Sequence, residues 1–186
     1  MSINLSKGEK IDLRKECPDL DEIFVGLGWD VNKGFGSDYD LDASVYLIGE
    51  DGRSLRPQNK VYYGHKQESG IRHLGDNLTG EGDGDDEVVE ISLNRLDQRV
   101  SRLAFTVDIY QAKQRRQQFS KVRNSYIRIV NKRTGKELLR YDLGNDFGKE
   151  TAVVVGEIYR YKGSFKFNAI GMGFEGGRQA LEEHFN

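Results

Sequence analysis

Cysteine, proline and histidine are scarce in this chain of 186 residues, and their scarcity excludes several classes of protein. Cys17 is the only cysteine, which excludes an intramolecular disulfide and a cysteine-rich zinc or iron–sulfur site and favours a reducing compartment. No apolar stretch approaches the roughly 20 residues needed to cross a bilayer, and the first residues lack the apolar core of a signal peptide. We therefore expect a soluble cytoplasmic protein with no direct membrane insertion.

An excess of one charge is also missing, since the formal net charge is -2. A protein that binds nucleic acid by neutralising phosphates carries a basic excess, so we expect no nucleic-acid partner. The length and the 37% hydrophobic content suit one continuous core, and we predict a single domain over residues 1–186.

Apolar residues recur mostly at every second position, which is the period of a half-buried strand. Residues 23–29 and 103–109 show this alternation, whereas residues 45–48 and 152–155 are continuously apolar and predict strands buried on both faces. Turn signals such as Thr134-Gly135 separate about nine or ten short strands. The sequence therefore predicts an all-β fold, and a β-sandwich is the economical architecture.

Two segments have helical character. Residues 111–119 combine good helix formers with almost no apolar stripe, which predicts a short polar surface helix or turn. Residues 178–185 place Ala180, Leu181 and Phe185 on one side, which predicts a C-terminal helix that docks on the body of the protein.

Acidic residues are concentrated in two short stretches. In the first, Asp38, Asp40 and Asp42 alternate with apolar residues, so in a strand they share one face. Successive same-face Cα atoms lie roughly 6.6 Å apart at about 3.3 Å per residue, so three carboxylates in line extend past one ion. Either two neighbouring cations or one cation covered by a second loop fits this spacing better.

The second stretch, GDNLTGEGDGDDE over residues 75–87, supplies such a loop. It interleaves carboxylate, amide and hydroxyl oxygens with glycines that allow backbone carbonyls to turn towards an ion. Asp30, directly after the strand that ends at Trp29, is a further candidate. The predicted ligands are Asp30, Asp38, Asp40, Asp42, Asp76, Asn77, Thr79, Gly80, Asp85, Asp86 and Glu87.

Calcium fits these oxygen donors best, because carboxylates packed this densely repel one another unless a hard cation lies among them. An EF-hand loop beginning at Asp38 fails, since Ala43 and Gly49 stand where its glycine and glutamate belong. Zinc lacks a pair of histidines at a useful spacing, magnesium needs fewer protein ligands, and manganese stays possible. The alternative is that both stretches are ordinary solvated turns that bind no metal.

Blocks along the whole chain resemble the TerD family of tellurium-resistance and general stress proteins. The matching blocks are GLGWD (26–30), DYDLDAS (38–44), GDNLTGEGDGDDE (75–87), NSYIRIV (124–130), GEIYRY (156–161) and KFNAIG (166–171). The resemblance implies a calcium-binding β-sandwich with paired ion sites that acts in resistance to tellurite and other stresses. It also implies protein partners from the same resistance complex, one of them embedded in the membrane, and thus a place in the cytoplasm at the periphery of the inner membrane.

The favoured function is a non-enzymatic calcium-binding module in which the ion links the two acidic stretches and orders a surface for a partner. One alternative is a metal-dependent phosphate-processing enzyme, although the chain offers no well-placed base or nucleophile. Another is a calcium-dependent adaptor at a membrane surface, which the basic residues of 113–123 would assist. Two further acidic residues lie inside predicted strands. We expect Asp108 to be exposed, and Glu157 to be a metal ligand, a partner of Arg160 or a solvent-facing residue.

Overall fold

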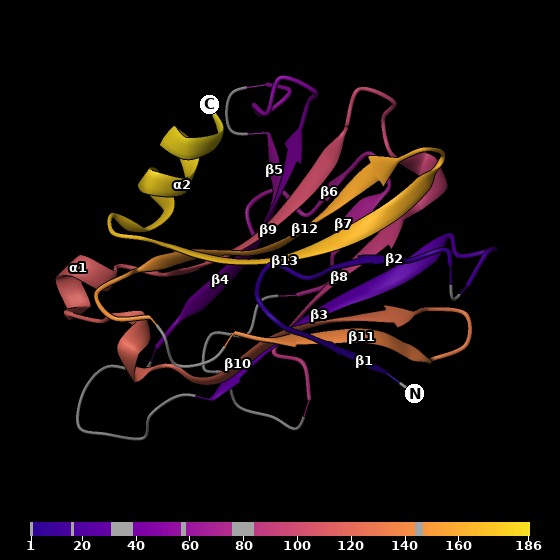
Figure 1. Cartoon of the computed structure of the whole chain (residues 1–186). Helices are drawn as coiled ribbons and strands as arrows, with labels where there is room; N and C mark the ends of the chain where they lie inside the picture. Colours follow the sequence, from indigo (N-terminus) through magenta and orange to yellow (C-terminus); the bar gives the residue numbers. More distant parts are fainter. Residues whose placement is uncertain (1, 16, 31–38, 57–58, 76–83, 144–146) are drawn as a thin grey trace.

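The computed structural model describes residues 2–15, 17–30, 39–56, 59–75, 84–143 and 147–186, which form two β-sheets packed face to face (Figure 1). Sheet A contains, in spatial order, β1 (Ile3–Leu5), β11 (Glu137–Asp142), β10 (Arg123–Asn131), β3 (Glu22–Asp30), β8 (Glu87–Ser92), β7 (Ile71–His73) and β6 (Gln67–Glu68). Sheet B contains β2 (Lys10–Asp12), β13 (Ser164–Phe174), β12 (Ala152–Tyr161), β9 (Arg102–Ile109), β4 (Leu41–Ile48) and β5 (Lys60–Val61). The predicted β-sandwich is confirmed.

Neighbouring strands are antiparallel except for β1 and β11, which run parallel. A turn at Thr134-Gly135 joins β10 to β11, as the sequence predicted, and Gly135 has a φ of 68° there. Glycine adopts this left-handed conformation without the steric cost that a Cβ atom brings. The first two strands, however, belong to different sheets, because β1 pairs with β11 and β2 pairs with β13.

The main core lies between the two sheets and receives alternate residues of each strand. In β3, the side chains of Ile23, Val25, Leu27 and Trp29 point into this core and are buried. Full burial of each aliphatic side chain contributes about 1.5–3 kcal/mol. The outer face of β3 carries the intervening residues, which include Gly26 and Gly28 and Asp30 at the end of the strand.

A smaller apolar cluster lies on the outer face of sheet B, where the C-terminal helix α2 (Gly177–Phe185) packs (Figure 1). Leu181 and Phe185 of the helix meet Tyr46, Ile48 and Val154 of the sheet, among others. This packing buries β4 on both faces and buries the first half of β12, as predicted for residues 45–48 and 152–155. The prediction of a docked C-terminal helix is also confirmed.

Two expectations differ from the structure. The described residues contain thirteen strands rather than nine or ten, because three of them, β5, β6 and β7, are two or three residues long and too short to show an alternation. Helix α1 covers only Ala112–Arg115, and a turn of 3-10 helix follows at Phe119–Lys121. Phe119 is buried in the main core, so the end of this segment is not a polar surface.

Candidate metal centre

The described ends of the two acidic stretches meet at one end of the sandwich. The backbone amide of Ala43 in β4 donates a hydrogen bond to Oε2 of Glu87 in β8, at 3.2 Å, and so connects the two sheets. The amide of Asp86 donates to the carbonyl of Leu27 at 2.8 Å, which extends the pairing of β8 with β3. The start of β4, directly after Asp40, therefore lies across the core from the start of β8, directly after Asp86.

Asp30 and Asp86 form the acidic centre of this region. Oδ2 of Asp86 accepts a hydrogen bond from the backbone amide of Trp29 at 2.7 Å. Oδ2 of Asp30 accepts one from Nδ2 of Asn124 at 2.5 Å. Burial raises the pKa of Asp86, the Trp29 amide opposes this rise, and the charges of Asp30 and Asp85 add to it. Negative charge thus gathers where a cation would relieve it.

Asp40 precedes β4 and lies half-buried beside the end of β9. Its carbonyl accepts the amide of Tyr110 at 2.8 Å, and its Oδ1 atom is shielded from solvent. The backbone of Asp40 is therefore held in place by the chain that leaves β9. Asp38, Asp76, Asn77, Thr79 and Gly80, also predicted as ligands, lie outside the described residues.

Asp42 lies on the outer face of sheet B, directly opposite Asp108 in the register of β4 and β9. Arg178 of α2 lies between the two carboxylates, with Nη2 at 2.5 Å from Oδ2 of Asp42 and Nε at 3.2 Å from Oδ1 of Asp108. Both aspartate side chains are only 4% exposed. The structure therefore places an arginine of the chain itself where the sequence suggested a shared ion.

The expectation that Asp108 is exposed is wrong, because α2 covers that face of sheet B. Burial raises the pKa of Asp108, and Arg178 acts in the opposite direction through its charge and its hydrogen bond. The pKa of Arg178 is raised even though burial disfavours its charge, because Asp108, Tyr63 and Asp42 stabilise the guanidinium. The alternation of side chains correctly placed Asp108 on the face of its strand that points away from the main core. It did not show that the predicted C-terminal helix covers this face.

Glu87 points between the sheets, and its Oε2 atom lies 2.8 Å from Nε2 of His73. Both side chains are 1% exposed. Asp85, in contrast, lies over the outer face of sheet A and binds Arg128 and Tyr126. Sequence patterns alone did not point to His73, Arg128 or Arg178 as partners of these carboxylates, although a charged residue inside the strand block 124–130 was a usable signal for Arg128.

The donor chemistry of this end of the molecule fits a hard cation, because the predicted ligands offer oxygen atoms. Among the described residues, however, no group of three or more His, Cys, Asp or Glu side chains is arranged to hold a metal ion. Asp42 and Asp85 are paired with arginines and Glu87 with His73, and Asp30 and Asp86 accept hydrogen bonds from the side chain of Asn124 and the amide of Trp29. The charge of Asp30 acts on Asp86, so these two described carboxylates form a pair whose repulsion a cation would relieve.

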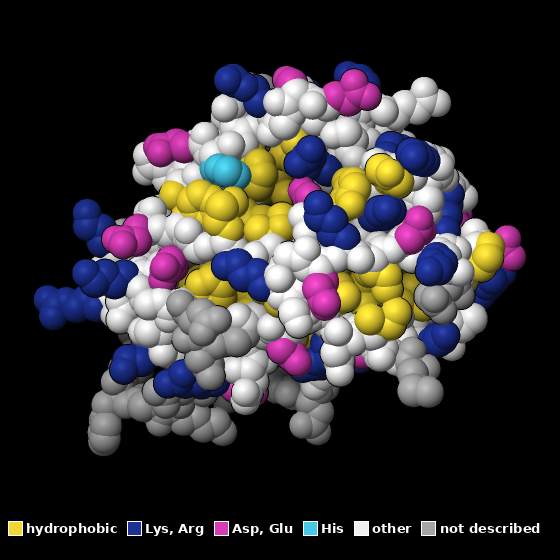
Figure 2. Space-filling view, viewed as in Figure 1, with side chains coloured by type: hydrophobic (Ala, Val, Ile, Leu, Met, Phe, Trp, Pro, Cys, Tyr) yellow, Lys and Arg dark blue, Asp and Glu magenta, His cyan; other side chains and the backbone are white. Residues whose placement is uncertain are grey.

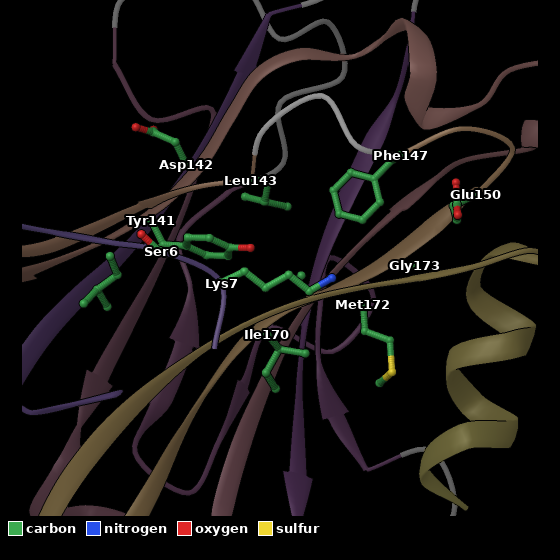
Figure 3. A pocket seen from close by; sticks show the side chains of 12 residues that line it. Ser6, Lys7, Tyr141, Asp142, Leu143, Phe147, Glu150, Ile170, Met172 and Gly173 are labelled. Atoms are coloured by element: carbon green, nitrogen blue, oxygen red, sulfur yellow. The ribbon is translucent and has the colours of Figure 1, made fainter. Parts of the chain in front are cut away.

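Two open clefts lie elsewhere. One, of about 640 Å³, is formed by β1, β11 and β13, and its described lining includes Lys7, Tyr141, Phe147 and Met172 but none of the predicted ligands (Figure 3). Another, of about 630 Å³, lies between α1 and the start of α2 and includes Asp108 and Arg178. The size of a cleft therefore does not identify the acidic centre.

Charges of both signs are interspersed with exposed hydrophobic side chains on the face shown in Figure 2. Arg115, one of the predicted basic residues, stacks on the ring of Tyr110 at 5.3 Å. Glu157 lies 3.4 Å from Arg102 and accepts Nδ2 of Asn168, while Arg160 donates to the carbonyl of Val100. In the described part of the chain, no helix has the length and apolarity that a membrane crossing requires.

Comparison with known proteins identifies the family. The model of the TerD domain matches residues 1–185. The chain is 45% identical to general stress protein 16U of Bacillus subtilis, over 95% of this chain and 93% of that protein. It is 42% identical to the tellurium resistance protein TerD of Serratia marcescens, again over 95% and 93% of the two chains.

A solved structure shares the fold. The crystal structure of a homologue of the telluride resistance protein TerD from Streptomyces coelicolor A3(2) superposes with a TM-score of 0.72 at 23% identity, covering 88% of this chain and 95% of that one. The matched proteins carry the names of stress and resistance proteins rather than of enzymes. The chain belongs to the TerD family of tellurium-resistance and general stress proteins.

Proposed function

We propose that this protein is a non-enzymatic calcium-binding module of the stress response. Bound Ca²⁺ would neutralise carboxylates at the end of the sandwich and link the segment that begins β4 to the segment that begins β8. The observation that carries this proposal is the grouping of Asp30 with Asp86, where burial first, and then the charges of Asp30 and Asp85, raise the pKa of Asp86. The Ala43–Glu87 hydrogen bond supports it, because it holds the two segments side by side.

The described residues refine the proposed ligand set. Asp30, Asp40 and Asp86 are the described carboxylates that we assign to the ion, and Asp38, Asp76, Asn77, Thr79 and Gly80 are sequence candidates that would complete two sites. Asp42, Asp85 and Glu87 have the protein partners given above, and we assign them structural roles. Filling the centre would order this end of the molecule as a surface for a protein partner.

The partners that we propose are other proteins of a stress or tellurium-resistance complex, one of them a membrane protein. The protein would then act in the cytoplasm, at the periphery of the inner membrane. The resistance and stress names of the matched relatives support this assignment. Turnover of a panel of phosphate esters that is lost in Asp86→Asn would replace the proposal with a metal-dependent enzyme.

Calorimetric titration with calcium, together with thermal melts in chelator and in calcium, tests the proposal. An ion that binds only the folded state stabilises it by about 2.7 kcal/mol at a hundredfold excess over its dissociation constant. Asp86→Asn should reduce both the uptake and the stabilisation, whereas Asp19→Asn, in an exposed turn, should change neither. Identical melts in chelator and millimolar calcium would refute the proposed function.

A further inference from the structure

Asp85, at the end of the acidic loop, makes a bidentate ion pair with Arg128 of β10. Nε of Arg128 lies 2.7 Å from Oδ1, and Nη2 lies 2.9 Å from Oδ2. The hydroxyl of Tyr126 donates a further hydrogen bond to Oδ1 at 2.9 Å. Both oxygen atoms of Asp85 therefore face donors from sheet A, and the carboxylate is 11% exposed. Paired arginine and carboxylate groups of this geometry are among the stronger polar contacts in proteins.

The two glycines of the GLGWD block make room for this contact. Gly26 stands opposite Arg128 in the sheet register, and Gly28 stands opposite Tyr126. A Cβ atom on Gly26 would lie 2.1 Å from Oδ2 of Asp85, and one on Gly28 would lie 2.4 Å from the ring of Tyr126. The carboxylate and the ring therefore pack directly on the backbone of β3, which no other residue type allows.

The donors are themselves held in place by neighbouring residues. Nη1 of Arg128 donates to Oε2 of Glu137 at 3.1 Å, and the guanidinium of Arg140 lies 3.7 Å from the centre of the Tyr126 ring. These contacts come from β11, the next strand of sheet A. The arginine and the tyrosine are thus presented by one strand, β10, and supported by its neighbour β11 rather than by a loop, which keeps their positions well defined.

The contact bears directly on Asp86, the next residue in the chain. The amide of Asp86 donates a hydrogen bond to the carbonyl of Leu27 and its carboxylate accepts one from the amide of Trp29, so both its backbone and its side chain are held against β3. Fixing Asp85 on the outer face of β3 therefore fixes the direction in which Asp86 projects. Residues that orient a metal ligand without touching the metal commonly change metal affinity by about 10- to 100-fold.

We infer that Asp85 is an anchor rather than a calcium ligand. The clamp formed by Asp85, Arg128 and Tyr126 positions Asp86 and so sets the affinity of the protein for calcium. This inference rests on the proposed calcium-binding function. Arg128 supplies the positive charge that neutralises Asp85 within the protein.

Calcium titration of clamp variants tests the inference. Arg128→Gln and Asp85→Asn should weaken calcium binding by about 10- to 100-fold and leave the number of bound ions unchanged. Arg133→Gln, an exposed basic residue in the turn that follows the same strand, is the matched control and should bind as the wild type does. Asp86→Asn, in contrast, should lower the number of ions. Wild-type affinity in Arg128→Gln, or a lost ion in Asp85→Asn, would overturn the inference.

Amide hydrogen exchange in chelator gives a readout that needs no metal. Breaking the clamp should speed exchange at the amides of Asp86 and Trp29, and the double variant Asp85→Asn/Arg128→Gln should exchange no faster than either single one. Gly26→Ala displaces the carboxylate by a second route, with Gly148→Ala as its control because the new Cβ meets only Glu150 at 3.7 Å.

The two proposals can fail separately. If the wild type binds calcium and the clamp variants bind it equally well, the inference fails and the proposed function stands. If the wild type takes up no calcium, the proposed function and the affinity claim both fail. Unchanged exchange at Asp86 in the clamp variants would refute the anchor in either case.

Discussion

Arg178 allows the sharpest test of how the C-terminal helix is held. It lies between two carboxylates that are each 4% exposed, and it also contacts the hydroxyl of Tyr63 at 3.2 Å. The substitution Arg178→Met removes the cation and leaves Asp42 and Asp108 facing each other under the helix. Removing one partner of a buried ion pair costs about 3–5 kcal/mol, because the remaining charge is left uncompensated.

Urea unfolding monitored by circular dichroism measures the predicted loss. The matched control is Arg99→Met, which removes a solvent-exposed pair with Asp97 and should change the stability much less than Arg178→Met does. The triple variant Arg178→Met/Asp42→Asn/Asp108→Asn removes the buried charges together and should recover most of the loss. A cost below about 1 kcal/mol for Arg178→Met, or no recovery in the triple variant, would refute this account of the helix contact.

Two further predictions concern packing and pH. Gly156→Ala should destabilise the fold by about 1–3 kcal/mol, as measured by urea unfolding. The reason is that the new Cβ atom would lie 2.5 Å from the Phe167 ring and 2.9 Å from the Asn168 carbonyl. A loss of stability no larger than that of Gly148→Ala would contradict this prediction. The hydrogen bond from Lys132, together with the charge of Arg72, lowers the pKa of Glu90 below its usual value of 4.5. The ionised Glu90 side chain therefore contributes fully to the stability of the fold above pH 4.5, and this contribution is lost as the pH falls through the folded-state pKa. Glu90→Gln should therefore be less stable than the wild type at neutral pH and lose that difference on acidification, and an equal difference at all pH values would argue against the pair.

The acidic centre was only partly predictable from the sequence. Carboxylate spacing alone nominated Asp42, Asp85 and Asp86 as equals, because local sequence shows which groups are acidic but not which cation each one meets. The structure separates them, since Asp42 meets Arg178 across 136 positions of sequence and Asp85 meets Arg128 across 43. Such pairings depend on the order of strands in each sheet, which residue types and spacing do not encode.

The sequence by itself determined the β-sandwich, the inward faces of its long strands and the docked C-terminal helix, because side-chain alternation follows directly from strand geometry. It also carried the family blocks, including the paired glycines at 26 and 28. Only the tertiary structure showed why these glycines are required, which face α2 covers, and which carboxylates the protein neutralises itself. Those outcomes arise from contacts between distant strands, where burial makes each unpaired charge costly and each partner specific.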